Sequence, residues 1–310
     1  MHELILHHYP TSPFAEKARL MLGFKQLSWR SVMIPPVMPK PDLTALTGGY
    51  RKTPVLQIGA DIYCDTALIA RRLEAEKATP ALYPEAQACN VATFAQWADS
   101  VVFQHAVSLV FAPESMAVRF AKVPPEFAKA FAADRAALFS GGTASRLPLE
   151  QARHQWPALM GRLQQQLQSG ADFLFGEPSL ADIALAHPLW FLRGTPVTAP
   201  LVDDYPAVAA WLARVLDFGH GSLSEMSSEQ AIAVAREATP AALPDEAFVD
   251  SNGFAAGQAV RIAAVDYGVD PVEGELLFAG REELILRRED ARVGVVHVHF
   301  PRLGFRIEAR

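Results

Sequence analysis

The order of strands and helices in the first 76 residues constrains the fold of this chain more than any other feature. A buried strand at ELILHH (residues 3–8) precedes an amphipathic helix at PFAEKARLML (13–22), and LSWRSVMI (27–34) is typical of a second strand before a short helix at DLTAL. Two strands, VLQI and DIYC, are separated only by Gly59 and Ala60, which predicts a hairpin. The helical pattern DTALIARRLEAEK follows, so the segment is an α/β unit with a mixed sheet.

Strand, helix, strand, helix, hairpin and helix is the element order of a thioredoxin-like domain, which we assign to residues 1–78. The Pro-containing connection ATPALYPEA then leads into a helical stretch over residues 86–219. The segment NVATFAQWADSVVFQHAVSLVF carries apolar residues at helical spacing, so we expect an all-helical second domain. Ser179 and Asp182 stand at capping-box spacing before an apolar run, which predicts a helix start.

The last segment, residues 220–310, changes character again. A helix is expected at SSEQAIAVAREA, where Ser227 and Gln230 have capping-box spacing. From about residue 254, five segments alternate apolar and polar residues between Gly, Pro and Asp turns, and we interpret them as a small antiparallel barrel-like accessory domain. The predicted fold class is therefore α/β plus all-α plus small β: a thioredoxin-like domain, a helical bundle domain and a barrel-like tail.

Charge and composition exclude several classes of function. The formal net charge is −6 and there is no long basic block, which argues against binding nucleic acid or a membrane surface. The start MHELILHH lacks the features of a secretory signal, and the most apolar later run, SVVFQHAVSLVFAP, is broken by Gln104 and His105, so we expect no membrane span. Cys64 and Cys89 are too few for a disulfide scaffold, which favours the reducing cytoplasm.

Two histidines near the end of the chain are candidate metal ligands. His297 and His299 in the segment HVHF share one face of a predicted strand. A structural zinc site needs four ligands, and neither a third nor a fourth is evident in the sequence. We therefore expect no metal.

Ser12 lies where the first strand passes into the first helix, in the stretch YPTSPFAEKAR. Ser at the N-cap followed by Pro is an ordinary helix start, in which the hydroxyl accepts a hydrogen bond from the helix's own amides. The same position also favours an anion such as a thiolate, because a helix N-terminus carries partial positive charge and free N–H groups. The residues alone leave both interpretations open.

Two further turns are expected to lie beside Ser12, since the ends of these strands meet in a sheet of this order. A cis Thr53–Pro54 bond would turn the Thr53 backbone toward an extended peptide, whereas a trans proline would only open a strand. Asp65 is suited to an ammonium and Thr66 to a carboxylate, although both are also good N-caps. Arg51 and Lys52 would complement a second carboxylate. The implied ligand is a short peptide with an amino-acid head and an acidic tail.

The segments SPFAEKARL, KTPVL, DTALIARRLE and PSLADIAL, in this order and spacing, make residues 3–219 resemble glutathione transferases. The resemblance implies that Ser12 donates a hydrogen bond to the glutathione thiolate and that Thr53, before Pro54, pairs with the cysteinyl backbone. It places Asp65 and Thr66 at the γ-glutamyl end and Phe14 in the binding site. Tyr9, three residues before Ser12, competes as the hydroxyl donor.

By the same resemblance, the chain is expected to be a cytoplasmic, homodimeric detoxification enzyme that activates the glutathione thiol for attack on a small hydrophobic electrophile. Glutathione is then a co-substrate, and no metal takes part. Phe103, Val107 and Phe111 on the long helix are candidates to contact the electrophile. The alternative is a protein that binds glutathione without catalysis, or an interaction module that uses its β tail.

Overall fold

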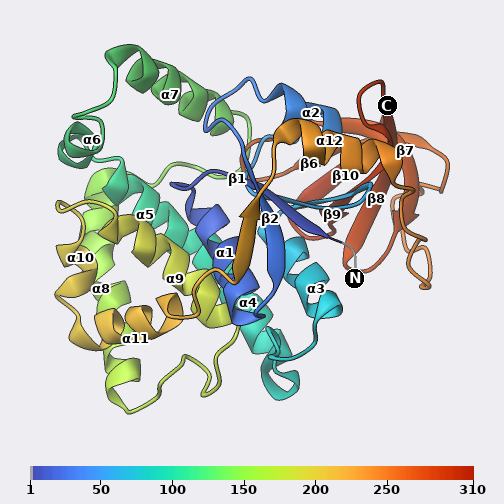
Figure 1. Ribbon diagram of the computed structural model, residues 1–310. Coiled ribbons are helices and arrows are strands. Elements are labelled where there is room, and N and C mark those ends of the chain that lie inside the picture. The colour runs from blue at the N-terminus through green and yellow to red at the C-terminus, as the bar shows by residue number, and fades with distance from the viewer. Residues whose placement is uncertain (1–2) are drawn as a thin grey trace.

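The first part of the chain folds as its element order predicts. The structure is a computed structural model that describes residues 3–310, shown in Figure 1. The thioredoxin-like domain comprises β1 (Leu4–His8), α1 (Pro13–Phe24), β2 (Ser28–Met33), α2 (Pro41–Thr47), β3 (Val55–Ile58), β4 (Asp61–Cys64) and α3 (Thr66–Glu76). β1 pairs in parallel with β2 and antiparallel with β3, and β3 and β4 form the predicted hairpin. The sheet is therefore mixed.

The helical part follows as a bundle that lies against the first domain. It comprises α4 (Ala88–Trp97), a π-helical turn (Ala98–Val102), α5 (Phe103–Val110), α6 (Pro113–Arg119), α7 (Pro125–Leu138), α8 (Leu149–Gln168), α9 (Leu180–Arg193), α10 (Pro200–Asp203) and α11 (Pro206–Leu216). The predicted capping box of α9 forms. The Ser179 amide donates to the Asp182 carboxylate, and the Ser179 hydroxyl accepts from the Ala181 amide. Helix α9 packs on α1, and one apolar core extends through both domains.

A single helix that crosses a bilayer must be both long and apolar. Among the described residues, no single helix is long and apolar enough to cross a membrane. The bent pair 85–110 and 113–119, which meet at 73°, passes that test together by length and composition only.

Residues 222–237 join the first domain, whereas the sequence analysis placed them with the tail. Strand β5 (Ser222–Glu225) pairs in parallel with β2. Helix α12 (Ser228–Glu237) starts with the predicted capping box of Ser227 and Gln230 and packs against α2, β2 and β9. Figure 1 shows α2 and α12 together on one side of the sheet, opposite α3.

The five predicted tail strands are present. They are β6 (Ala259–Ala264), β7 (Val272–Ala279), β8 (Glu283–Asp290), β9 (Gly294–Pro301) and β10 (Phe305–Ala309), in the spatial order β10-β6-β7-β8-β9. Only residues 302–304 join β9 to β10, a link that reaches about 14 Å at full extension. Four strand spacings in a flat sheet would need about 19 Å. The five strands must therefore curl back on themselves, as the barrel-like prediction requires.

The tail continues the sheet of the thioredoxin-like domain. Strand β9 pairs in parallel with β4, with Asp61 opposite His297 and Tyr63 opposite His299, so that the ten strands of residues 3–310 form one sheet. A second apolar core runs from Leu46 of α2 and Ile62 of β4 to Leu286 and Val298 of the tail. The tail thus covers apolar surface of the thioredoxin-like domain. This contact joins segments far apart in the sequence, so no local pattern predicts it.

Candidate functional site

A cavity of about 1010 Å³ lies where the three parts of the chain meet. Every residue that the sequence analysis placed in a glutathione site lines this cavity, and so do the three candidates for the electrophile side. Those residues are Tyr9, Ser12, Phe14, Arg51, Lys52, Thr53, Pro54, Asp65, Thr66, Phe103, Val107 and Phe111. The structure therefore brings together groups that are up to about a hundred positions apart in the sequence.

Ser12 is the N-cap of α1 and is nearly buried. Its hydroxyl oxygen accepts from the Ala15 amide at 3.2 Å, and Pro13 occupies the first helical position. This is the ordinary capping geometry, and it leaves the hydroxyl hydrogen available for a second acceptor in the cavity. Tyr9 lies on the same wall, and its backbone carbonyl accepts from the Ser12 amide at 3.2 Å.

The Thr53–Pro54 peptide bond is cis, which resolves the alternative that the sequence left open. Beside it, the Lys40 ammonium donates to the Thr53 hydroxyl at 3.1 Å and lies 5.7 Å from the centre of the Tyr9 ring. Burial, reinforced by the positive charges of Arg135 and Arg51, lowers the pKa of Lys40 to about 8. The cavity therefore contains a buried amine that the sequence analysis did not identify.

Asp65 caps α3 from a backbone conformation that few residues adopt. Its φ of +76° lies outside the regions open to most L-residues, and its carboxylate accepts from the Ala67 amide at 2.9 Å. Backbone strain of this kind is common at functional sites. Burial raises the pKa of Asp65, although Lys52, the Ala67 amide and Lys17 oppose that change.

Below the start of α3 lies a buried polar cluster that joins the first domain to the helical domain. Lys17, which is fully buried, donates to the Thr66 hydroxyl at 3.2 Å and to Asp99 at 2.5 Å. The other oxygen of Asp99 lies 2.9 Å from His187 Nε2 on α9. Burial alone would raise the pKa of Asp99, but Lys17 and His187 together bring it below its ordinary value.

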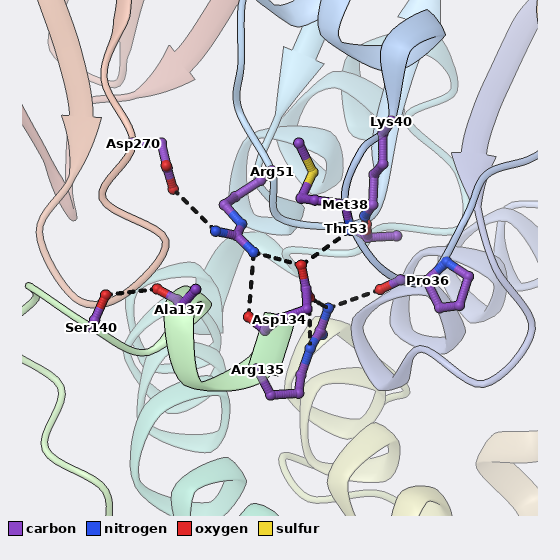
Figure 2. A network of polar contacts seen from close by, with 10 residues as sticks. All are labelled: Pro36, Met38, Lys40, Arg51, Thr53, Asp134, Arg135, Ala137, Ser140 and Asp270. Atoms are coloured by element: carbon purple, nitrogen blue, oxygen red, sulfur yellow. Dashed lines mark hydrogen bonds and ion pairs between the residues drawn. The ribbon is translucent and has the colours of Figure 1, made fainter. Parts of the chain in front are cut away.

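Arg51 and Lys52, which the sequence analysis placed near a ligand carboxylate, are paired with carboxylates of the protein itself. Arg51 binds Asp134 of α7 at 2.8 Å and has Asp270 at 3.9 Å. Figure 2 shows Arg51 between these two carboxylates. Lys52 binds Asp266 at 2.6 Å. The sequence revealed two exposed-looking cations before a proline but not their partners, which come from the helical domain and the tail.

The tail also forms part of the cavity wall. The amides of Thr143 and Ala144 donate to the carbonyls of Val265 and Asp266 at 2.9 and 3.0 Å. Gly142 is needed in this contact, because a Cβ there would lie 1.6 Å from the Asp266 carbonyl oxygen. These bonds join the helical part to the tail, while Arg51 and Lys52 join the first domain to both.

The side of the cavity within the helical domain is aromatic. The ring of Phe14 lies 4.6 Å from those of both Phe103 and His187, so Phe14 contacts the helical domain from the first turn of α1. Farther along, Phe111, Phe120, Phe127, Phe131 and Phe191 line the wall around Arg119. The Arg119 guanidinium lies 4.8 Å from the Phe191 ring, and within residues 3–310 its Nη1 has no hydrogen-bond partner.

Three site residues escaped the sequence analysis for different reasons. Lys17 stands three positions after Phe14 and four before Met21, so a cation on the apolar face of the helix was a usable signal. Lys40 stands before Pro41 without any local pattern. Asp266 comes from a turn that reaches the cavity only through the tertiary fold.

Comparisons with known proteins match both the thioredoxin-like domain and the helical domain. A family model for the glutathione S-transferase N-terminal domain matches residues 6–81, and one for the C-terminal domain matches residues 148–214. A crystal structure of a GST-like protein from Pseudomonas syringae is 65% identical, with a TM-score of 0.86 over 100% of both chains. The chain belongs to the glutathione S-transferase family. The comparison with curated proteins found no match.

Two more distant transferases match only part of the chain. A glutathione S-transferase III structure and a glutathione S-transferase from Rhodospirillum rubrum F11 are each 21% identical, with TM-scores of 0.51. Each match covers 69% of this chain. It covers 91% of the glutathione S-transferase III chain and 87% of the Rhodospirillum rubrum chain. The Pseudomonas syringae relative, in contrast, matches this transferase-family chain over its whole length, β tail included.

Proposed function

We propose that this protein binds glutathione in the cavity and activates its thiol for attack on a small hydrophobic electrophile. The observation that carries the proposal is that Ser12, Thr53 and Asp65, from three separate turns, line one cavity at the N-termini of α1 and α3. Membership of the glutathione S-transferase family supports the same ligand.

In this proposal, the γ-glutamyl end of glutathione lies at the start of α3. Asp65 pairs with the ligand ammonium, and the amides of the first helical turn bind its carboxylate. The Thr66 hydroxyl accepts a hydrogen bond from Lys17 and donates its own proton to the same carboxylate. Thr53 pairs with the cysteinyl backbone as an added strand would.

The glycine carboxylate needs a cation, and Lys40 suits it better than Arg51 or Lys52. Lys40 has a hydroxyl as its partner, whereas the other two are neutralised by Asp134 and Asp266. Since the pKa of Lys40 is about 8, the ammonium is lost as pH rises through that value. Affinity for S-methylglutathione, which has no thiol proton, should therefore fall between pH 7 and 9.

A Lys40→Arg variant is the matched control for that titration, because arginine stays protonated throughout this range. Calorimetry across the pH series should show a smaller decline for the variant than for the parent protein. An equal decline in both would remove Lys40 from the glycine end.

Activation of the thiol is proposed to combine two effects. The α1 N-terminus favours an anion, and the Ser12 hydroxyl donates to the developing thiolate, so the thiol pKa falls from about 8.5 toward neutrality. The thiolate then attacks an electrophile in the aromatic part of the cavity. Arg119 lines this part of the cavity with its guanidinium 4.8 Å from the Phe191 ring, and its charge favours an aromatic electrophile that carries a carboxylate.

The deciding experiment compares Ser12→Ala with Tyr9→Phe, each of which removes one hydroxyl from the same wall. Conjugation of glutathione to a general aromatic electrophile should fall by roughly a hundredfold in Ser12→Ala, the usual effect of losing one donor to a developing anion, and should change little in Tyr9→Phe. The reverse pattern would make Tyr9 the donor.

A binding measurement separates this proposal from its alternative. Asp65→Asn, which keeps a capping side chain, should weaken glutathione binding by at least about tenfold in calorimetry. Tight binding by the parent protein with no turnover of any aromatic electrophile would favour a non-catalytic glutathione-binding module. The homodimer, the cytoplasmic location and the detoxification role also belong to this proposal, and sedimentation tests the first of them.

A further inference from the structure

A second cluster of reactive side chains lies at the junction of the tail with the thioredoxin-like domain, away from the cavity. It comprises Asp61 at the start of β4, His297 and His299 on β9, and Glu283 on β8. The parallel pairing of β4 with β9 sets Asp61 directly beside His297, and the two-residue period of the strand puts His299 on the same face. None of the four residues lines the cavity described above.

Three atoms in this cluster converge on one point. Asp61 Oδ1 lies 3.0 Å from His299 Nε2 and 3.8 Å from His297 Nδ1, and all three atoms lie within 4.8 Å of one another. A tetrahedral zinc ion with bonds of about 2.1 Å holds its ligand atoms about 3.4 Å apart. The two observed separations bracket that value, so an ion fits with small side-chain movements.

The atoms next to these three are also arranged as in metal sites. Glu283 lies 2.6 Å from His299 Nδ1, which directs Nε2 toward Asp61, and ligating histidines usually have such a carboxylate behind them. The second oxygen of Asp61 accepts from the Ala241 amide at 2.8 Å, which turns Oδ1 toward the two imidazoles. The Tyr63 ring stacks on His299 with centroids 4.3 Å apart and fixes the plane of the imidazole.

The burial and the charges of these side chains favour a cation between them. The side chains of Asp61, His299 and His297 are only 6%, 7% and 13% exposed. Two carboxylates face one imidazole here, and the nearby Arg287 is itself paired with Glu289 at 3.2 Å. Within residues 3–310, His297 Nδ1 is buried without a hydrogen-bond partner, and a bound cation would satisfy it.

We propose that Asp61, His297 and His299 bind a divalent transition metal of the zinc type, with water as the fourth ligand, and that the ion fastens the tail to β4. Imidazole and carboxylate ligands in tetrahedral arrangement are the usual zinc set. Binding releases the proton that His299 shares with the carboxylates, so the ion replaces a proton bridge with three metal bonds.

The test measures binding of Zn²⁺ and Co²⁺ to the full chain, freed of metal beforehand with a chelator. We expect one equivalent per chain, cobalt absorption bands of a four-coordinate site without a thiolate charge-transfer band, and a rise in Tm of at least about 2 °C at a hundredfold excess over Kd. Failure to bind either ion would mean that the cluster holds only a proton.

The informative variant is His297→Leu, because it removes one ligand atom and leaves the Asp61–His299–Glu283 contacts in place. Its affinity for Zn²⁺ should fall by at least tenfold, while His154→Leu, on the exposed face of α8, should bind as the parent does. Equal binding by the parent and His297→Leu would assign the metal to another site and overturn the proposal.

A diffraction measurement decides the matter even if the variant fails to fold. Crystals of the parent protein soaked in Zn²⁺ should show anomalous scattering at the zinc edge between the three ligand atoms. No peak there at saturating zinc, or a peak only at Cys89 or at surface histidines, would overturn the proposal.

Discussion

The helical domain and the β tail attach to the thioredoxin-like domain in different ways. The helical domain is held through side chains: α1 packs on α9, and Lys17, Asp99 and His187 form a buried polar cluster between them. The tail is held through the backbone, because β9 extends the sheet beyond β4. An interface of side chains can be repacked by substitution, whereas the tail also depends on the backbone bonds of β9 to β4, which most side-chain substitutions leave in place.

The largest effect is therefore expected from removing the tail. A chain that ends at residue 239 exposes the edge of β4 and the apolar groups of α2 and β4 that the tail covers, and unpaired, apolar edge strands aggregate. We expect little soluble protein and no cooperative unfolding transition, measured by size-exclusion chromatography and circular dichroism.

A nicked chain is the control for the truncation. A protease site placed within residues 242–248, between α12 and β6, cuts the connection but leaves the strand pairing and the bonds of the Ala241 and Val249 amides in place. The two pieces should stay together and keep the parent's ability to bind glutathione. If the tail instead dissociates and leaves a soluble, glutathione-binding remainder, the tail is the accessory that the sequence suggested.

The next effect concerns the helical interface. Asp99→Leu leaves the ammonium of Lys17 buried without its carboxylate, which should lower the free energy of unfolding by about 3–5 kcal/mol. The matched double variant Lys17→Met with Asp99→Leu replaces both charges by apolar groups and should recover much of that loss. Urea denaturation measures both. A loss below about 1 kcal/mol in the single variant would show that the cluster contributes little to this interface.

The features that could be predicted from the sequence are those that depend on neighbours in the chain. The elements of residues 1–76, Ser12 as a cap, Asp65 and both capping boxes depend on contacts within a few positions, so local patterns were sufficient. The five tail strands were predicted for the same reason, from their alternation and their turns.

What the sequence did not predict depends on pairs far apart in the chain. The pairing of Asp61 with His297 joins positions more than two hundred residues apart, and no local pattern encodes it. This is why the third ligand beside His297 and His299 was missed. The carboxylate partners of Arg51 and Lys52 could not be predicted for the same reason, since a sequence displays a charge but not its partner.

The smallest expected effect compares two carboxylates that anchor these neighbouring cations. Asp134 of the helical domain, 8% exposed, accepts from Arg51, Arg135 and the Met38 amide, whereas Asp266 of the tail is 44% exposed and pairs with Lys52. Asp134→Asn should cost about 1–3 kcal/mol, because it leaves buried donors poorly satisfied. Asp266→Asn should cost less than about 1 kcal/mol, as for other partly exposed ion pairs.

The pH dependence sharpens that comparison. Burial alone would raise the pKa of Asp134, but the Met38 amide, Arg135 and Arg51 lower it overall. A carboxylate whose folded pKa lies below its unfolded value stabilises the protein above about pH 4, and this contribution is lost as pH falls through the folded pKa. The Tm difference between the parent and Asp134→Asn should therefore be constant from pH 7 to 5 and shrink below about pH 4. A gap that is already closing at pH 6 would mean that the carboxylate charge is not what fastens α7 to Arg51.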